Sequence, residues 1–389
     1  MTLELANGMA AFSFIPPAMP PGTRQLREEV REFLHVELAA LTPLEKARSW
    51  MGFDAVFSRK LGARGWIGMT WPKQYGGRER SALERYVVLE ELLAAGAPVA
   101  AHWIADRQSG PLLLRYGTQA QRERFLPAIA RGEHYFCIGL SEPGAGSDLA
   151  AVRTRAHAVE GGWRLNGTKL WTTLADRAHS MIALVRTSGE ADARHVGLSQ
   201  LLIDLSSPGV TVRPIVDMLH ESHFNEVVFE DAFVPHDRLI GHEGDGWHQS
   251  VAELSLERSG PERYLSSYQL MLELIAAAGR RSPESVRLLI GELAADLWTL
   301  RQMSLAIAGQ LALGKDPALE AAIVKDLGCS FEQRLPVAIQ AILDDDLESA
   351  NPALSAVMSY LLQSSPSFSL RGGTREILRG IIARGLGLR

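Results

Sequence analysis

The spacing of apolar residues changes twice along this sequence, and the two changes limit the folds that it can adopt. Before residue 136, apolar side chains such as Leu26, Val30 and Phe33 recur every three or four positions, which is typical of helices packed on one face. From Phe136, short apolar runs end at Gly, Pro or Asp, which is typical of strands. Helical spacing returns after residue 245. The sequence therefore predicts helices, then strands, then helices.

The strand-like runs have no long helix between them. They cover residues 136–141, 151–158, 163–173, 180–186, 198–204, 210–216 and 225–234. Such runs favour an antiparallel sheet over a parallel, doubly wound one. Asn166-Gly167 predicts a hairpin turn, because both residues tolerate positive φ. The predicted fold class is α+β with three domains: all-helical over 1–135, β over 136–245, and helical, similar to a four-helix bundle, over 246–389.

Composition excludes several classes of protein. The 389 residues are 46% hydrophobic and 22% charged, so a large core is available and the composition argues against global disorder. A net charge of -5 gives no general attraction to nucleic acid or to anionic membranes. Cys137 and Cys329 form no disulfide framework, and Cys137 is expected to be a buried structural thiol. With no signal peptide, membrane span or metal-ligand spacing, a soluble cytoplasmic protein without a metal is expected.

A turn rich in glycine and proline follows the first predicted strand. Ser141 ends the strand, and Gly144, Gly146 and Ser147 follow in the turn. Glycines let the backbone approach a ligand closely, and Ser147 with nearby amides can bind an anion. Spacing alone leaves an ordinary turn after a core strand as the alternative.

Two further segments make the pattern specific. One ends a predicted strand with Trp171-Thr172-Thr173, and the other is the glycine-led segment 372–384. With the first turn, they resemble the acyl-CoA dehydrogenase family of flavoproteins, in the family's order and spacing, from about residue 21 to the end. The resemblance implies FAD, a small antiparallel β-barrel as middle domain, and α,β-dehydrogenation of an acyl-CoA thioester to a trans-2,3-enoyl-CoA. In that reaction a carboxylate takes the α proton and flavin N5 accepts the β hydride.

The resemblance also assigns individual roles. Ser141 would lie at the pyrimidine side of the flavin, Trp171 would cover one face of the ring, and Thr173 would lie near N5. A core position for Trp171 and a simple helix cap for Thr374 are the alternatives. The full predicted set for FAD is Ile138, Leu140, Ser141, Gly146, Ser147, Trp171, Thr172, Thr173, Thr374 and Glu376, and the set for substrate is Ser147, Arg258 and Gly373.

The position of the catalytic base departs from the commoner pattern. Many members carry a glutamate directly before the final Gly-Thr, where this chain has Gly372, which cannot take a proton. A smaller set of relatives uses the glutamate of a Leu-Glu-Arg segment, which here is Leu256-Glu257-Arg258. Glu257 lies at the edge of an apolar helical stripe, where partial burial could raise the pKa of its carboxyl group. We therefore expect Glu257 to be the base; a solvated glutamate paired with an arginine is the alternative.

Two segments that reach the flavin of a neighbouring subunit in relatives are missing here. The corresponding regions are 279–285 and 341–346, and the second contains an acidic triplet, Asp344-Asp345-Asp346. The chain is thus expected in a divergent branch, as a homodimer, a homotetramer or a heterotetramer with a related subunit. An electron-transfer flavoprotein or a similar acceptor would take the electrons. An acyl-CoA oxidase and a non-catalytic partner subunit remain the alternative functions, and segment 224–235 looks like branches that handle bulky, branched or ring-bearing acyl-CoAs.

Overall fold

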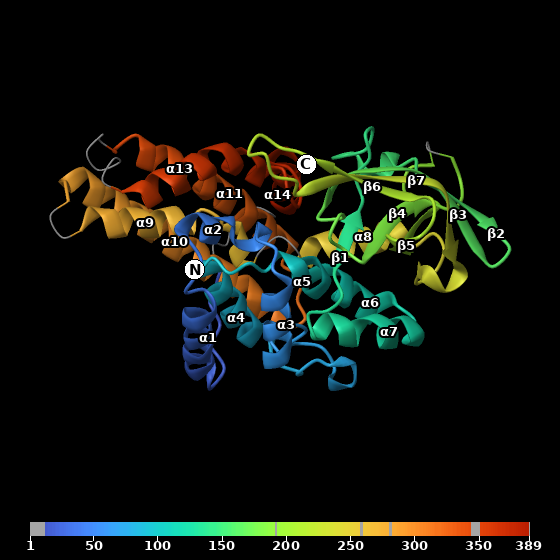
Figure 1. The fold of residues 1–389 in the computed structure, drawn as a ribbon, viewed down its shortest axis with the longest axis horizontal. Helices are drawn as coiled ribbons and strands as arrows, with labels where there is room; N and C mark the ends of the chain where they lie inside the picture. The colour runs from blue at the N-terminus through green and yellow to red at the C-terminus, as the bar shows by residue number, and fades with distance from the viewer. Residues whose placement is uncertain (1–11, 191–192, 257–259, 280–281, 344–350, 389) are drawn as a thin grey trace. The chain divides into compact units, whose positions relative to one another are not determined.

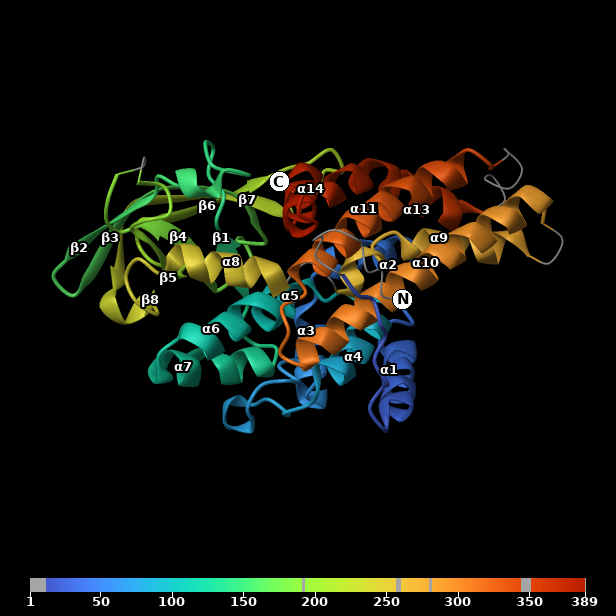
Figure 2. The same ribbon diagram turned by 180° about the vertical axis from the view of Figure 1, so that it is seen from behind.

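A computed structural model describes residues 12–190, 193–256, 260–279, 282–343 and 351–388. The chain divides into two compact units. Unit 1 contains Met1–Phe53, Arg80–Val99 and Arg258–Arg389; unit 2 contains Asp54–Glu79 and Ala100–Glu257. Figures 1 and 2 show the elements of both units from two opposite sides. Each unit is described separately below.

Unit 1 is helical. Its α-helices are α1 (Thr23–Glu37), α2 (Pro43–Arg48), α4 (Ala82–Ala94), α9 (Tyr268–Ala278), α10 (Glu284–Ala312), α11 (Ala318–Gln340), α13 (Pro352–Ser364) and α14 (Arg375–Gly385). Short 3-10 turns are η1 (Ser49–Met51), η7 (Pro261–Arg263) and η8 (Ser365–Ser369). Helix α4 packs against α1 and α10, and α11 packs against α10, α13 and α14. Apolar side chains such as Leu300, Val324 and Leu335 are buried between these helices.

Unit 2 combines helices with one sheet. Its helices are α3 (Ala55–Arg64), the 3-10 turn η2 (Lys73–Tyr75), α5 (Ala100–Ile104), the π-helical segment η3 (Ala105–Ser109), α6 (Gly110–Tyr116), α7 (Gln119–Ala130) and α8 (Gly246–Leu256), with 3-10 turns η4 (Leu149–Ala151) and η6 (His236–Arg238). Its strands are β1 (Phe136–Gly139), β2 (Arg155–Val159), β3 (Gly162–Thr173), β4 (Ser180–Arg186), β5 (Leu198–Asp204), β6 (Val210–Ile215), β7 (Phe224–Pro235) and β8 (Leu239–Ile240). The predicted order of helices, strands and helices is confirmed.

Local sequence signals explain where several helices begin. In α4 the Ser81 side chain accepts from the Glu84 amide, while the Glu84 carboxylate accepts from the Ser81 amide. Thr118 and Gln121 form the same reciprocal pair at the start of α7. These capping boxes satisfy amides that have no partner inside the helix. The sequence spacing Ser-x-x-Glu and Thr-x-x-Gln is therefore what sets the start of these two helices.

The sheet is mixed and open, so the expected antiparallel barrel is wrong. The strand order is β6-β7-β3-β2-β4-β5-β8, with β1 paired to β4 outside this path. Strand β1 runs parallel to β4, with Phe136 opposite Ser180, because the chain reverses direction twice between them, at the β2–β3 turn and again after β3. Strands β6 and β8 lie at opposite ends of the order, and the sheet does not close. Strand β4 is buried along its whole length, which fits its continuous apolar run.

The hairpin predicted at Asn166-Gly167 is also wrong, because β3 continues through these residues. The turn of the β2–β3 hairpin lies instead at Glu160-Gly161, where Gly161 has φ 79°. At Asn166 the pairing with β7 shifts register, and the Asp231 amide donates to the Asn166 side chain at 2.8 Å. Asn166-Gly167 therefore marks a β-bulge in the β3–β7 pair, since the residue types that suit a turn also suit a bulge.

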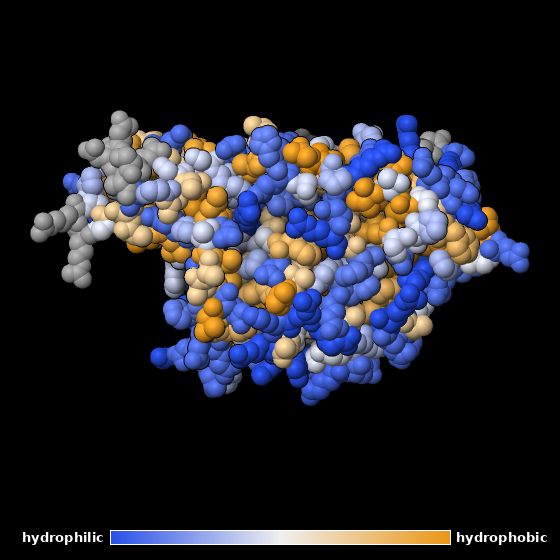
Figure 3. Space-filling model, viewed as in Figure 1, coloured by the Kyte–Doolittle hydropathy of each residue, from blue (hydrophilic) through white to orange (hydrophobic). Residues whose placement is uncertain are grey.

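The surface carries scattered apolar residues. On the face shown in Figure 3, small hydrophobic groups are separated by hydrophilic ones. Within the described residues, no helix is both long enough and apolar enough to cross a bilayer.

Candidate active site

Trp171 lies on a second bulge of β3, which turns its indole outward. Between Lys169 and Thr172 the pairing with β7 contains an extra β3 residue, and Trp171 has φ 60°. Without this bulge, alternation would place Trp171 on the same face as Lys169, which is buried. The bulge instead leaves Trp171 57% exposed and buries Thr172. The core position considered for Trp171 is therefore excluded, and unit 2 presents a flat aromatic surface.

The turn that follows β1 is bound to β3 beside this indole. The Leu170 amide donates to the Ser141 carbonyl at 2.9 Å, so Ser141 lies next to the residue that precedes Trp171. Glu142 and Ala145 pair through two backbone hydrogen bonds of 2.9 and 3.1 Å, which form a tight turn. A Cβ added at Gly144 or Gly146 would meet no atom within 4 Å, so the turn is open on that side.

Both carboxylates that flank this turn are paired with cations. Lys169 Nζ lies 2.7 Å from Glu142 Oε1, and both residues are buried. On the surface, Arg194 Nη2 lies 2.8 Å from Asp148 Oδ1. Burial alone would raise the pKa of Glu142, but the charge of Lys169 and the hydrogen bonds that Glu142 accepts hold this pKa below its usual value. The turn therefore presents hydroxyl and amide donors without an unpaired flanking carboxylate.

Neighbouring residues support the bulged end of β3. The buried Asn225 on β7 donates to the Thr172 carbonyl and to Asp176, both at 3.2 Å. The Leu174 amide donates to the His223 carbonyl at 2.9 Å, and the Phe224 ring lies edge-on to Trp171 with 6.2 Å between ring centroids. Thr172 Oγ1 is buried and has no hydrogen-bond partner among the described residues. These contacts fix the backbone from which the side chains of Trp171 and Thr173 project.

In unit 1, the glycine-led segment forms the N-terminus of α14. Thr374 is the N-cap, and its hydroxyl accepts from the Ile377 amide at 3.5 Å, as the capping alternative expected. Gly372 and Gly373 have φ 63° and 98°. Lys325 Nζ, which is buried, donates to the Gly373 carbonyl at 2.6 Å. Hydrogen bonds from its own amide and from Thr374 lower the pKa of the exposed Glu376, so Glu376 stays ionised at neutral pH.

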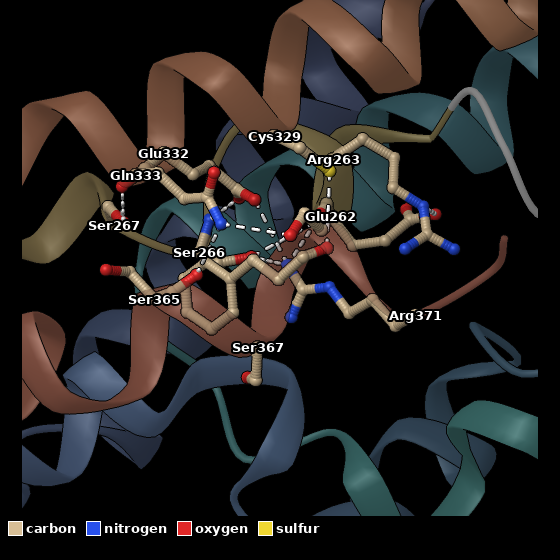
Figure 4. A network of polar contacts seen from close by, with 12 residues as sticks. Glu262, Arg263, Ser266, Ser267, Cys329, Glu332, Gln333, Ser365, Ser367 and Arg371 are labelled. Carbon is tan, nitrogen blue, oxygen red and sulfur yellow. Dashed lines mark hydrogen bonds and ion pairs between the residues drawn. The ribbon is translucent and has the colours of Figure 1, made fainter. Parts of the chain in front are cut away.

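A polar network anchors the chain just before this segment (Figure 4). Arg371 Nη2 donates to Ser266 Oγ at 2.7 Å and to Glu332 Oε2 at 3.1 Å. The fully buried Glu332 also accepts from the Ser266 amide at 2.7 Å. The Arg371 guanidinium lies 4.5 Å from the Trp50 ring centroid and 4.2 Å from that of Phe368. These contacts hold Arg371 in place, and with it the backbone that leads into Gly372.

The structure describes only part of the predicted site. Ile138, Leu140, Ser141, Gly146, Ser147 and Trp171 to Thr173 belong to unit 2, whereas Gly373, Thr374 and Glu376 belong to unit 1. Glu257 and Arg258 lie outside the described residues, as do Arg280, Arg281 and the acidic triplet at 344–346. Cys137 and Cys329 are buried, and burial raises the pKa of both thiols, as expected for structural cysteines.

Sequence analysis missed Lys169 and Glu142. A signal was present, because strict alternation along β3 places Lys169 on the same face as the core residues Trp163 and Leu165. A charged residue at a core position requires a partner of opposite charge, which would have directed attention to Glu142.

Comparison with known proteins identifies the family. Residues 20–133 match the model "Acyl-CoA dehydrogenase, N-terminal domain" and residues 137–232 match "Acyl-CoA dehydrogenase, middle domain". Together with an open mixed sheet between helical segments, these matches define a flavin-dependent oxidoreductase. The chain belongs to the acyl-CoA dehydrogenase family, whose cofactor is FAD.

Individual relatives agree with this assignment. The chain is 34% identical to acyl-CoA dehydrogenase IpdE1 of Mycobacterium tuberculosis, over 94% of this chain and 96% of that protein. Among solved structures, it resembles the "Tcur3481-Tcur3483 steroid ACAD" with a TM-score of 0.84 and 26% identity, over 95% of this chain and 98% of that one. The ChsE4-ChsE5 complex from Mycobacterium tuberculosis gives a TM-score of 0.82 and 27% identity over the same shares.

The residues of unit 2 fit the family's cofactor. An exposed indole beside an open turn suits a flat ring, because it offers a large aromatic surface for stacking. The pairing of Glu142 and Asp148 with cations removes the repulsion that an anionic cofactor would otherwise meet. These features make unit 2 suitable for the flavin part of FAD.

Proposed function

We propose that this chain converts an acyl-CoA thioester to a trans-2,3-enoyl-CoA, with Glu257 taking the α proton. When bound, FAD supplies the acceptor for the β hydride. The outward indole of Trp171 beside the Ser141 turn is the observation that carries the proposal. In the proposed site, Trp171 would cover one face of the flavin ring. The hydroxyl groups of Ser141 and Thr173 would donate toward the ring, where reduction adds negative charge. Arg258 orients the Glu257 carboxylate or the thioester end of the substrate.

Thr374 and Glu376, two of the predicted FAD contacts, lie at the N-terminus of α14. Thr374 Oγ1 already caps the helix, and Glu376 is ionised. We therefore propose that the first backbone amides of α14 bind the FAD diphosphate, because the helix dipole favours an anion there. The side chains of Thr374 and Glu376 lie beside these amides. Contacts of Gly373 and Ser147 with substrate stay predictions, as do the three domain boundaries and a cytoplasmic location.

Replacing the proposed base tests the mechanism. The Glu257→Gln protein should bind FAD normally but bleach it at least a thousandfold more slowly when mixed anaerobically with acyl-CoA, because the amide cannot accept the α proton. Glu243→Gln, an exposed glutamate in the same unit, is the matched control and should react as the wild type does. Normal bleaching by Glu257→Gln would refute the assignment.

The proposed substrate is a ring-bearing acyl-CoA. The resemblance of segment 224–235 to branches that use bulky substrates supports this class, as does the similarity to the Tcur3481-Tcur3483 steroid ACAD. Anaerobic mixing with linear, branched and steroid acyl-CoAs, followed by flavin absorbance, should give the fastest bleaching with a steroid substrate. Faster bleaching with a linear chain would exclude this class.

A mixed oligomer is the second part of the proposal. The related complex of two named chains supports assembly with a related subunit. Co-expression with a related acyl-CoA dehydrogenase subunit should yield a flavin-containing complex. An electron-transfer flavoprotein should accept the electrons from its reduced flavin. Peroxide formation in air as fast as dye reduction would instead favour an oxidase. A protein that stays colourless when mixed with FAD would favour a non-catalytic partner role.

A further inference from the structure

Three consecutive residues of the turn after β1 are tied to two consecutive residues of β3. Lys169 Nζ donates to the Leu140 carbonyl at 3.2 Å and contacts Glu142 Oε1 at 2.7 Å. Between these contacts, the Ser141 carbonyl accepts from the Leu170 amide at 2.9 Å. Leu140 and Ser141 are predicted flavin contacts on one segment, and Trp171 begins such contacts on the other. One lysine therefore joins the two segments.

Glu142 extends the same attachment to a third segment. Its carboxylate accepts from the Arg153 amide at 2.7 Å and from the Thr154 amide at 2.9 Å, just before β2. Since its backbone also pairs with Ala145, Glu142 is held at both its main chain and its side chain. The start and end of the turn are thus fixed by bonds that do not involve its exposed residues.

The lysine stem is packed as tightly as its charged end. Lys169 is fully buried, and a Cβ added at Gly139 would lie only 3.1 Å from Lys169 Cγ and 2.8 Å from Met181 Sδ. Strand β1 can therefore approach the stem closely only because residue 139 is glycine. A buried ion pair adds little net stability compared with apolar residues of the same size. Its clearest effect here is on geometry.

We propose that the Lys169–Glu142 pair positions the flavin-binding surface by locking the Ser141 turn against the Trp171 bulge. Both residues are positioning residues, because they act through Leu140, Ser141 and Trp171 and stay buried themselves. This inference rests on the proposed flavin contacts of those residues. It predicts that FAD affinity depends on the pair beyond any effect on folding.

The test compares FAD binding by the full-length apoproteins of Lys169→Met, Glu142→Gln and the double variant. The dissociation constant comes from quenching of flavin fluorescence, and visible circular dichroism reports the setting of the bound ring. The single variants leave one buried charge unpaired and should lose thermal stability. The double variant should regain much of that stability, yet its FAD dissociation constant should remain at least tenfold above that of the wild type, with an altered dichroism band.

Val234→Ala is the control for stability. Val234 is a buried β7 residue opposite Trp163, at the other end of β3 from Trp171. It should lower the thermal midpoint and leave FAD affinity unchanged. Lys169→Arg, which keeps the charge, should restore part of the affinity. Wild-type affinity and dichroism in the double variant would overturn the inference.

Trp171→Ala separates this inference from the proposed site. If Trp171→Ala weakens FAD binding and the double variant does not, only the positioning role is wrong. If neither variant changes FAD binding, the proposed flavin contacts in unit 2 are wrong as well.

Discussion

Gly372 differs from the family's commoner glutamate in its surroundings as well as in its side chain. Its backbone has φ 63°, and a Cβ there would lie 2.9 Å from Arg263 Nη2 and 3.3 Å from Lys325 Cε. Both cationic side chains are buried. The side chain of a glutamate at this position would therefore start beside two cationic side chains. Their charges would lower the pKa of its carboxyl group and make it a poor base. The local packing favours a base located elsewhere in the chain.

Gly372→Ala should destabilise the protein. A side chain at positive φ and a contact of 2.9 Å together should cost about 1–3 kcal/mol of unfolding free energy. Thermal unfolding followed by circular dichroism measures the loss. Gly291→Ala is the matched control, because this exposed helical glycine has open space around it and should gain up to about 1 kcal/mol. An unchanged midpoint for Gly372→Ala would contradict the packing argument.

At the scale of elements, a histidine cluster joins α7 to the start of the sheet. The His134 ring stacks on His179 with centroids 5.0 Å apart and lies 5.5 Å from the Phe125 ring. His134 Nε2 is 3.0 Å from Ser180 Oγ, the first residue of β4. Burial, followed by the effects of His179 and of nearby arginines, lowers the pKa of His134 to about 4. The folded protein therefore keeps this ring neutral.

This cluster predicts acid sensitivity. Between about pH 6.5 and about pH 4, His134 is protonated in the unfolded chain but stays neutral in the folded chain. The free energy of unfolding therefore falls as the pH falls through this window. Partial exposure limits the loss to about 1–2 kcal/mol. Urea unfolding at pH 7 and pH 5 should show the loss in the wild type and a smaller one in His134→Gln. The exposed His157→Gln should behave as the wild type; equal losses in all three would exclude His134 as the cause.

Sequence reasoning succeeded for elements set by neighbours in the chain and failed where a distant partner decides. Helix starts at Ser81 and Thr118 follow from residues three positions apart. The residue types of Asn166-Gly167 predict a turn. Pairing with β7, whose Asp231 amide donates to Asn166, makes this segment a bulge instead. The outward rotation of Trp171 and the parallel pairing of β1 likewise depend on partners far along the chain. The family resemblance predicts a role for Trp171 but not this geometry.

At the scale of the whole molecule, Arg371 connects segments that are distant in the sequence. It contacts Trp50, Ser266, Glu332 and Phe368. Arg371→Gln should cost about 3–5 kcal/mol, because it removes the cation that contacts the fully buried Glu332. Thermal unfolding measures the change. Arg334→Gln, which breaks exposed pairs with Glu292 and Asp296, should change stability by less than about 1 kcal/mol. Similar effects of both variants would contradict a special role for Arg371.

The order of the two units along the chain has a consequence for biosynthesis. Helices α2 and α4 emerge from the ribosome early, but they pack on α9, α10 and α13, and Trp50 meets Arg371 only when translation is nearly complete. Unit 2 ends at Glu257, so all of it leaves the ribosome before these late helices do. Since compact units generally fold as they are completed, unit 2 is expected to reach its native state first, while α2 and α4 keep the faces that contact α9, α10 and α13 exposed until those helices have been made.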